Sequence, residues 1–262
     1  MCHAAGNACV KEPAHDPIHT NIIIHHTMNK QSNTYTIIYI IVLVVLVGTA
    51  LAATSLALKD RQQENINADK MNQILAAALI TPAKGETVAD FDRYITSQLV
   101  VNELGDTIAG VKAFDVNVAA EVKLPADQRK LPVFVCTTPD GATKYILPAY
   151  GAGLWGPIWG YVAFDSDGST IYGAYFAHQG ETPGLGAEIE KPAFSDQFKG
   201  KHIFKDGRFH PIAVVKAGQL PIGNEDYVDG ISGGTITSKG VGSMLDNSLT
   251  PYRGFLEKLA GK

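Results

Sequence analysis

The first hydrophobic feature of the chain is one long apolar run. From Tyr35 to Leu58 almost every residue is apolar, and no residue between Lys30 and Lys59 carries a formal charge. A helix of this length spans about 36 Å, which is enough to cross a hydrocarbon core of about 30 Å with some tilt. Tyr35 and Tyr39 suit the membrane interface. The pattern predicts one transmembrane helix over residues 35–58.

A cleaved signal peptide is the alternative interpretation of this run, because "TALAATSLA" holds small residues of the kind found at cleavage sites. Its apolar part is longer than the roughly 7–15 residues of a signal peptide, which favours a retained anchor. The flanking charges, Lys30 before the run and Lys59 and Arg61 after it, leave the orientation open.

Helical patterns follow the apolar run. Residues 59–85 are rich in helix formers and end at Pro82 and Gly85, which predicts a helical connector. The stretch "TVADFDRYITSQLV" then predicts a second helix, with Thr87 as its N-cap.

From Ala113 onward the hydrophobic pattern has a period of two residues. It predicts strands in "AFDVNVAAEV", "LPVFVCTT", "KYILPAY" and "HPIAVVKAG", and a hairpin in "GYVAFDSDGSTIYGAYFAH" that turns at Asp167 and Gly168. The stretch "VGSMLDNSL" predicts a helix that ends near Pro251. We therefore expect an α+β fold, in which a single N-terminal transmembrane helix precedes a soluble domain with an antiparallel sheet and flanking helices.

Composition limits which partners the chain can bind and whether its N-terminal residues can hold a metal. A net charge of −4 offers no basic field for a nucleic-acid backbone, so we expect no nucleic-acid partner. Residues 1–27 hold Cys2, Cys9 and five of the eight histidines, among them His15, His19, His25 and His26, but lack the paired spacing of a zinc site. We interpret residues 1–27 as an extension upstream of Met28, with residues 28–34 as a short cytoplasmic segment, and expect no metal site.

The stretch "DGISGGTITSKG", Asp229 to Gly240, is the richest in candidate chemistry. It contains the G-x-S-x-G pattern of a hydrolase nucleophile, but no histidine follows His210, so a triad in that order cannot form. It also lacks the G-K-[ST] ending of a phosphate-binding P-loop, because Lys239 lies between Ser238 and Gly240. A simple turn with a helix cap and a cradle for an anion both remain open.

Two further glycine-rich stretches could cover a flat ligand. "ETPGLG" sets Leu185 between two glycines, and "GAGLWG" does the same for Leu154 and Trp155.

Together these features resemble the C subunit family of the sodium-translocating NADH:quinone reductase, from "SNTYTIIY" to the end of the chain. "DGISGGT" is similar to the flavinylation motif of bacterial FMN-binding domains, although Gly234 stands where the family usually has alanine. The resemblance implies one covalent FMN, joined to Thr235 by a phosphoester, with Thr237 and Ser238 near the phosphate. The implied cofactor-binding residues are Leu154, Trp155, Glu181, Thr182, Leu185, Ser232, Gly233, Gly234, Thr235, Thr237 and Ser238.

The resemblance also implies an activity and a setting. It implies an electron-carrier subunit of a translocase that oxidises NADH, reduces quinone and moves sodium, with no complete active site in this chain alone. The implied partners are the A, B, D, E and F subunits of the complex and a flavin transferase. Residues 86–262 would form the FMN-binding domain, on the periplasmic side of a bacterial inner membrane. The alternatives are the G subunit of a ferredoxin:NAD oxidoreductase complex of the RNF type and a non-redox, membrane-anchored binding module.

Overall fold

The computed structural model describes residues 33–261. The predictions about Cys2, Cys9 and the N-terminal histidines lie outside these residues. The chain divides into two compact units, residues 1–59 and residues 60–262, and each is described by itself below.

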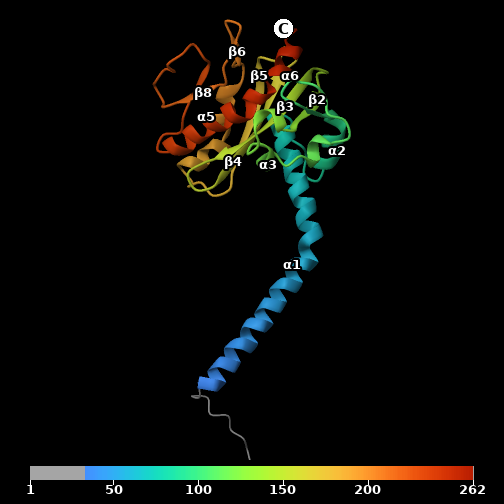
Figure 1. The fold of residues 1–262 in the computed structure, drawn as a ribbon, viewed down its shortest axis with the longest axis vertical. Coiled ribbons are helices and arrows are strands. Elements are labelled where there is room, and N and C mark those ends of the chain that lie inside the picture. Colours follow the sequence, from blue (N-terminus) through green and yellow to red (C-terminus); the bar gives the residue numbers. More distant parts are fainter. Residues whose placement is uncertain (1–32, 262) are drawn as a thin grey trace, which may run out of the picture. The chain divides into compact units, whose positions relative to one another are not determined.

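Helix α1, Asn33–Ala77, contains the predicted membrane span (Figure 1). Its apolar side chains from Ile37 to Leu58 are exposed rather than packed against other residues. Length and composition make it a helix that could cross a membrane. The helix passes without a break through the small residues of "TALAATSLA". These properties fit a single-pass membrane protein.

The second unit is built on an antiparallel sheet, as predicted. Within residues 33–261 this sheet has five strands, which lie side by side in their order along the chain. Each strand pairs with the next in antiparallel register. The strands are β1 (Ile95–Val101), β2 (Leu131–Thr137), β3 (Thr143–Ala152), β4 (Pro157–Asp165) and β5 (Ile171–His178).

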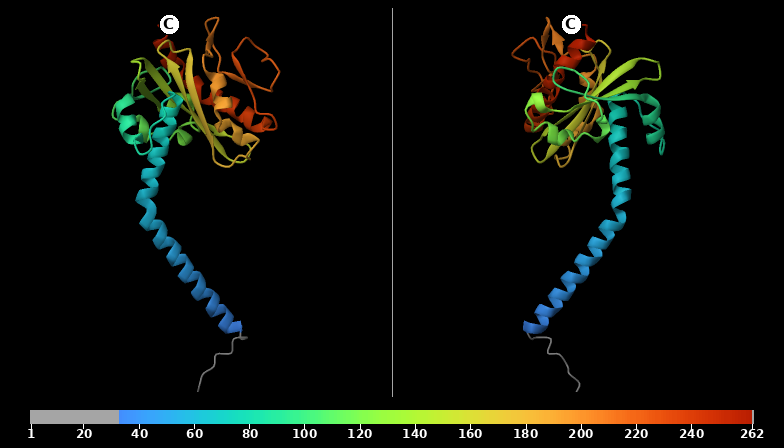
Figure 2. Two further views of the ribbon diagram at one scale, coloured as in Figure 1. Left: turned by 180° about the vertical axis from the view of Figure 1, so that it is seen from behind. Right: turned by 45° about the vertical axis from the view of Figure 1, so that its right-hand side comes forward.

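Both faces of the sheet are covered, because neighbouring residues along a strand point to opposite faces. Ile146 packs with the C-terminal end of α1 and with α2 (Thr87–Tyr94), whereas Leu147 packs with α5 (Thr235–Leu249) and α6 (Arg253–Leu259). Figures 1 and 2 show these helices on the two sides of the strands. The sheet is thereby a layer packed on both faces, and loops project from its ends.

Short elements complete the domain. A parallel pair, β8 (Ala213–Val215) with β9 (Tyr227–Asp229), lies outside the main sheet, and β6 (Phe204–Lys205) pairs with β7 (Arg208–Phe209). The remaining elements are η1 (Ala113–Asp115), α3 (Val118–Glu121), η2 (Ala126–Gln128), η3 (Gly186–Glu190), α4 (Pro192–Ser195), η4 (Asp196–Phe198) and η5 (Thr250–Tyr252).

Three local predictions were wrong. Residues 113–122 form η1 and α3 instead of a strand, because Asn117 caps α3 by accepting the Ala120 N–H, 3.2 Å away. The second helix ends at Tyr94, and "ITSQLVV" becomes edge strand β1. Glu86 rather than Thr87 stands at the N-cap, and the Thr87 hydroxyl donates to Asn72 instead.

Candidate functional site

Three loops surround a hollow of about 380 Å³ at one end of the domain. They are the turn between β3 and β4, the loop after β5, and the loop that leads into α5. The residues that line the hollow are Leu154, Trp155, Glu181, Thr182, Leu185, Gly186, Gly233, Gly234, Thr235, Ile236 and Thr237. Nine of the predicted site residues are therefore brought together, while Ser232 and Ser238 lie on a neighbouring hollow.

Thr235 is the first residue of α5, and its side chain is exposed. The N-cap is Gly234, which has no side chain to accept the first-turn N–H groups. These N–H groups have no partner inside a helix, and together with the helix dipole they favour an anion. A phosphate attached to Thr235 would lie next to them.

The loop before Thr235 is held tightly. Gly233 has a φ of 77°, a conformation that favours glycine, and a side chain there would meet Leu185. A methyl group on Gly234 would lie 3.1 Å from Ile231 Cβ, so the departure from the usual alanine spares a close contact. The Ser238 Oγ accepts the Ile231 N–H at 2.8 Å. Ser238 thus fastens the loop to α5.

Glu181 joins the walls of the hollow. The residue is 5% exposed, and its carboxylate accepts the Thr237 hydroxyl at 2.5 Å and the Trp155 N–H at 2.8 Å. Burial by itself raises the pKa of Glu181, but the bonds from Thr237 and from the N–H groups of Trp155 and Leu154 together bring this pKa below its ordinary value. The carboxylate is ionised at neutral pH and ties the β3–β4 turn to the start of α5.

Large apolar side chains stand exposed around the hollow. Leu154 is 47% exposed, Trp155 69%, Leu185 43% and Ile236 57%. Four such side chains around one concave site are typical of a place where a flat apolar ligand binds. Ile236 and Gly186 were not among the predicted residues. An apolar residue directly after Thr235, at the exposed start of a helix, was the signal for Ile236.

Comparisons with known proteins agree with this geometry. A model of the FMN-binding domain matches residues 153–250, a range that includes all three loops. The C subunit of the Na(+)-translocating NADH-quinone reductase of Vibrio anguillarum is 34% identical over 83% of this chain and 91% of its own length. The chain belongs to the C subunit family of this reductase. The C subunit from Vibrio vulnificus is 38% identical over 77% of this chain and 83% of its own length.

Solved structures confirm the fold. The crystal structure of the C subunit from Parabacteroides distasonis has 50% identity and a TM-score of 0.71, over 76% of this chain and 96% of that one. NqrC from Shewanella oneidensis has 27% identity and a TM-score of 0.62, over 76% of this chain and all of that one. The resemblance seen in the sequence is thus confirmed, and the C subunit is favoured over the G subunit of an RNF-type complex.

Proposed function

We propose that this chain is an electron-carrier subunit of a sodium-translocating NADH:quinone reductase and carries one FMN as a phosphoester on Thr235. The observation that carries this proposal is the exposed Thr235, at a helix N-terminus and at the rim of a hollow with exposed apolar walls. The match of residues 153–250 to the FMN-binding domain supports the identity of the ligand.

The residues of the hollow fit the parts of FMN. Leu154, Trp155, Leu185 and Ile236 would cover the apolar isoalloxazine ring, and the first-turn N–H groups of α5 would receive the phosphate. Bound FMN supplies the reversible uptake and release of electrons. The rim of the hollow is held in place by hydrogen bonds of Glu181, Thr237 and Ser238 within the protein. The hydroxyls of Thr237 and Ser238 are therefore already engaged by protein groups and support the site rather than contact the FMN.

The attachment needs an outside catalyst. A threonine hydroxyl is a weak nucleophile without an adjacent base. Among the described residues that line the hollow, Glu181 is the only carboxylate, and both of its oxygens are engaged by Thr237 and Trp155. A separate flavin transferase is therefore the proposed source of the FMN.

Other subunits would complete the reaction. The chain has three cysteines in all, so it cannot form a four-cysteine iron–sulfur site by itself. We propose that the A, B, D, E and F subunits provide the sites for NADH and quinone, and that the flavin domain lies on the periplasmic side of the inner membrane. Protease access to the domain in spheroplasts, but not in intact cells, tests this orientation.

In-gel fluorescence tests the attachment. The full chain, produced together with a flavin transferase, is expected to give a fluorescent band after denaturing electrophoresis. Thr235→Val should abolish the band, because it removes the acceptor oxygen and keeps the shape of the side chain. Thr182→Val is the matched control, since Thr182 is exposed in the same hollow. A fluorescent Thr235→Val band would contradict attachment at Thr235. A colourless wild-type chain would contradict the flavin itself and favour a non-redox binding module.

A further inference from the structure

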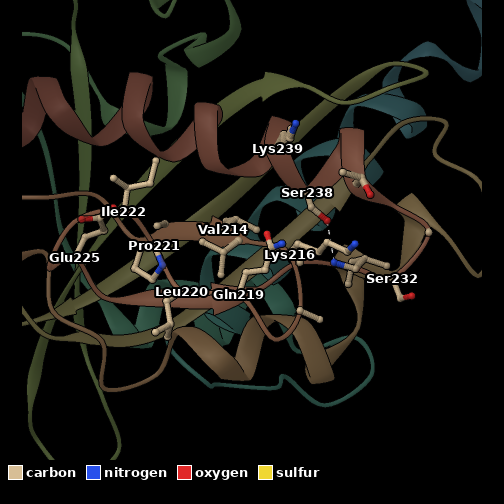
Figure 3. A pocket seen from close by; sticks show the side chains of 17 residues that line it. Val214, Lys216, Gln219, Leu220, Pro221, Ile222, Glu225, Ser232, Ser238 and Lys239 are labelled. Carbon is tan, nitrogen blue, oxygen red and sulfur yellow. Dashed lines mark hydrogen bonds between the residues drawn. The ribbon is translucent and has the colours of Figure 1, made fainter.

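A second hollow, of about 560 Å³, is drawn in Figure 3. It lies beside the first hollow and also reaches Thr235. It is formed by β8, by the loop of residues 216–226 that joins β8 to β9, and by the loop and first turns of α5. Gly233 and Thr235 line both hollows. The proposed attachment residue thus stands on the ridge between two concave surfaces.

The second hollow has the size and the apolar walls of a site that binds a flat aromatic ring. Both volumes fall within the range of about 300–1,000 Å³ that is usual for small-molecule sites. Its walls include Val214, Leu220 and Pro221, together with Ile222, whose side chain is fully exposed. Exposed leucine and isoleucine on one loop beside an apolar wall indicate a surface that is covered in the working protein.

The charges of the two hollows differ. The first contains the Glu181 carboxylate and no lysine or arginine among its lining residues. The second has Lys216, Lys239 and Glu225 among its lining residues (Figure 3). Ammonium groups donate hydrogen bonds and accept none, so the second hollow suits the carbonyl oxygens at one end of an isoalloxazine ring.

We propose that the second hollow is a second seat for the isoalloxazine ring of the FMN on Thr235, so that the ring moves between two positions about one fixed phosphate. This inference rests on the proposed function. The ribityl chain between phosphate and ring has several rotatable bonds, and a tethered group meets both nearby surfaces at high effective concentration. An electron carrier must meet a donor and an acceptor. Two seats on either side of one tether allow both encounters without movement of the whole domain.

Trp155 makes the two seats distinguishable by spectroscopy. An indole in contact with a flavin quenches its fluorescence by electron transfer, and Trp155 lines the first hollow. Among the described residues, no tryptophan or tyrosine lines the second hollow. Time-resolved fluorescence of the oxidised full chain should therefore contain a short lifetime from the first seat and a long lifetime from the second.

Three variants assign these lifetimes. Trp155→Phe should lengthen the short component and leave the long one unchanged. Leu220→Trp should shorten the long component at least several-fold, because it places an indole at the second seat. Leu104→Trp is the matched control, since Leu104 is 70% exposed and Leu220 is 77% exposed, but Leu104 lines neither hollow. It should change neither lifetime.

The outcomes separate this inference from the proposed function. Covalent flavin is first measured by the fluorescent gel band, and its absence would contradict the attachment itself. If the band is present but only a short lifetime is seen, the second seat is overturned. A long lifetime that Leu220→Trp leaves unchanged overturns it as well, because such a ring lies in solvent.

Discussion

The bond between Thr237 and Glu181 is expected to hold the flavin hollow together, and Thr237→Val tests it. Valine keeps the branched shape of threonine and removes only the hydroxyl. Thr237 is 1% exposed and Glu181 is 5% exposed, so their bond is largely shielded from solvent. The carboxylate oxygen that accepts this hydroxyl at 2.5 Å would be left without it.

The magnitude follows from the type of bond. A hydrogen bond to a charged group contributes about 1.5–3 kcal/mol, and loss of one partner in a buried pair leaves the other unsatisfied. We expect Thr237→Val to lower the free energy of unfolding by about 2 kcal/mol, which reduces the ratio of folded to unfolded protein about 30-fold. The apolar volume is kept, so no cavity contributes to this loss.

Urea denaturation of the full chain in detergent, followed by tryptophan fluorescence, measures the change. Thr182→Val provides the comparison, because it makes the same substitution at an exposed position of the same hollow and should stay within about 0.5 kcal/mol of wild type. Equal stability of the two variants would refute the argument that the bond to Glu181 supports the hollow.

Three further predictions follow from the same geometry. The pKa of Glu181 is lowered in the folded state, so its ionised carboxylate stabilises the fold above its unfolded pKa of about 4.3. This stabilisation is lost as the pH falls through the folded pKa. Between pH 7 and pH 3, the free energy of unfolding should therefore fall less for Thr237→Val than for wild type. Gly186→Ala places a methyl group onto Glu181 Oε2 and Thr237 Oγ1, so it should destabilise the chain at least as much as Thr237→Val and lower the yield of attached flavin, measured by the fluorescent gel band. Gly242→Ala lies inside α5 with its new methyl 3.7 Å from Val214, an ordinary contact, and should raise the urea midpoint through a gain of up to about 1 kcal/mol.

Much of the fold could be predicted from the sequence where one signal dominated. The apolar run before Lys59 reflects the length of a membrane span, and the apolar stretches along β2 to β5 reflect burial inside the domain; a local pattern records both. Apolar and polar residues also alternate in residues 113–122. However, Ala113 and Val116 are buried on the face of the sheet that packs with α1 and α2, and Asn117 caps helix α3. Tertiary packing determined the structure of this segment, and the local sequence pattern holds no information about that packing.

The candidate site was predicted in part for a similar reason. Glycine-rich loops leave a mark on the sequence, and the hollow contains nine of the eleven residues that the family resemblance implied. The contact between Glu181 and Thr237 joins residues 56 positions apart, so the sequence could not show that they bond to each other. The second hollow depends on how the loop of residues 216–226 folds over α5, which no motif records.

The central claim is that FMN is attached to Thr235, and mass spectrometry of one peptide tests it most directly. Trypsin cuts after Lys216 and Lys239, and the peptide between these sites contains Ser232, Thr235, Thr237 and Ser238. From chain produced with a flavin transferase, this peptide should be heavier by one FMN minus one water, and fragmentation should place the added mass on Thr235. An unmodified peptide, or an adduct on Thr237 or on either serine, would contradict the account.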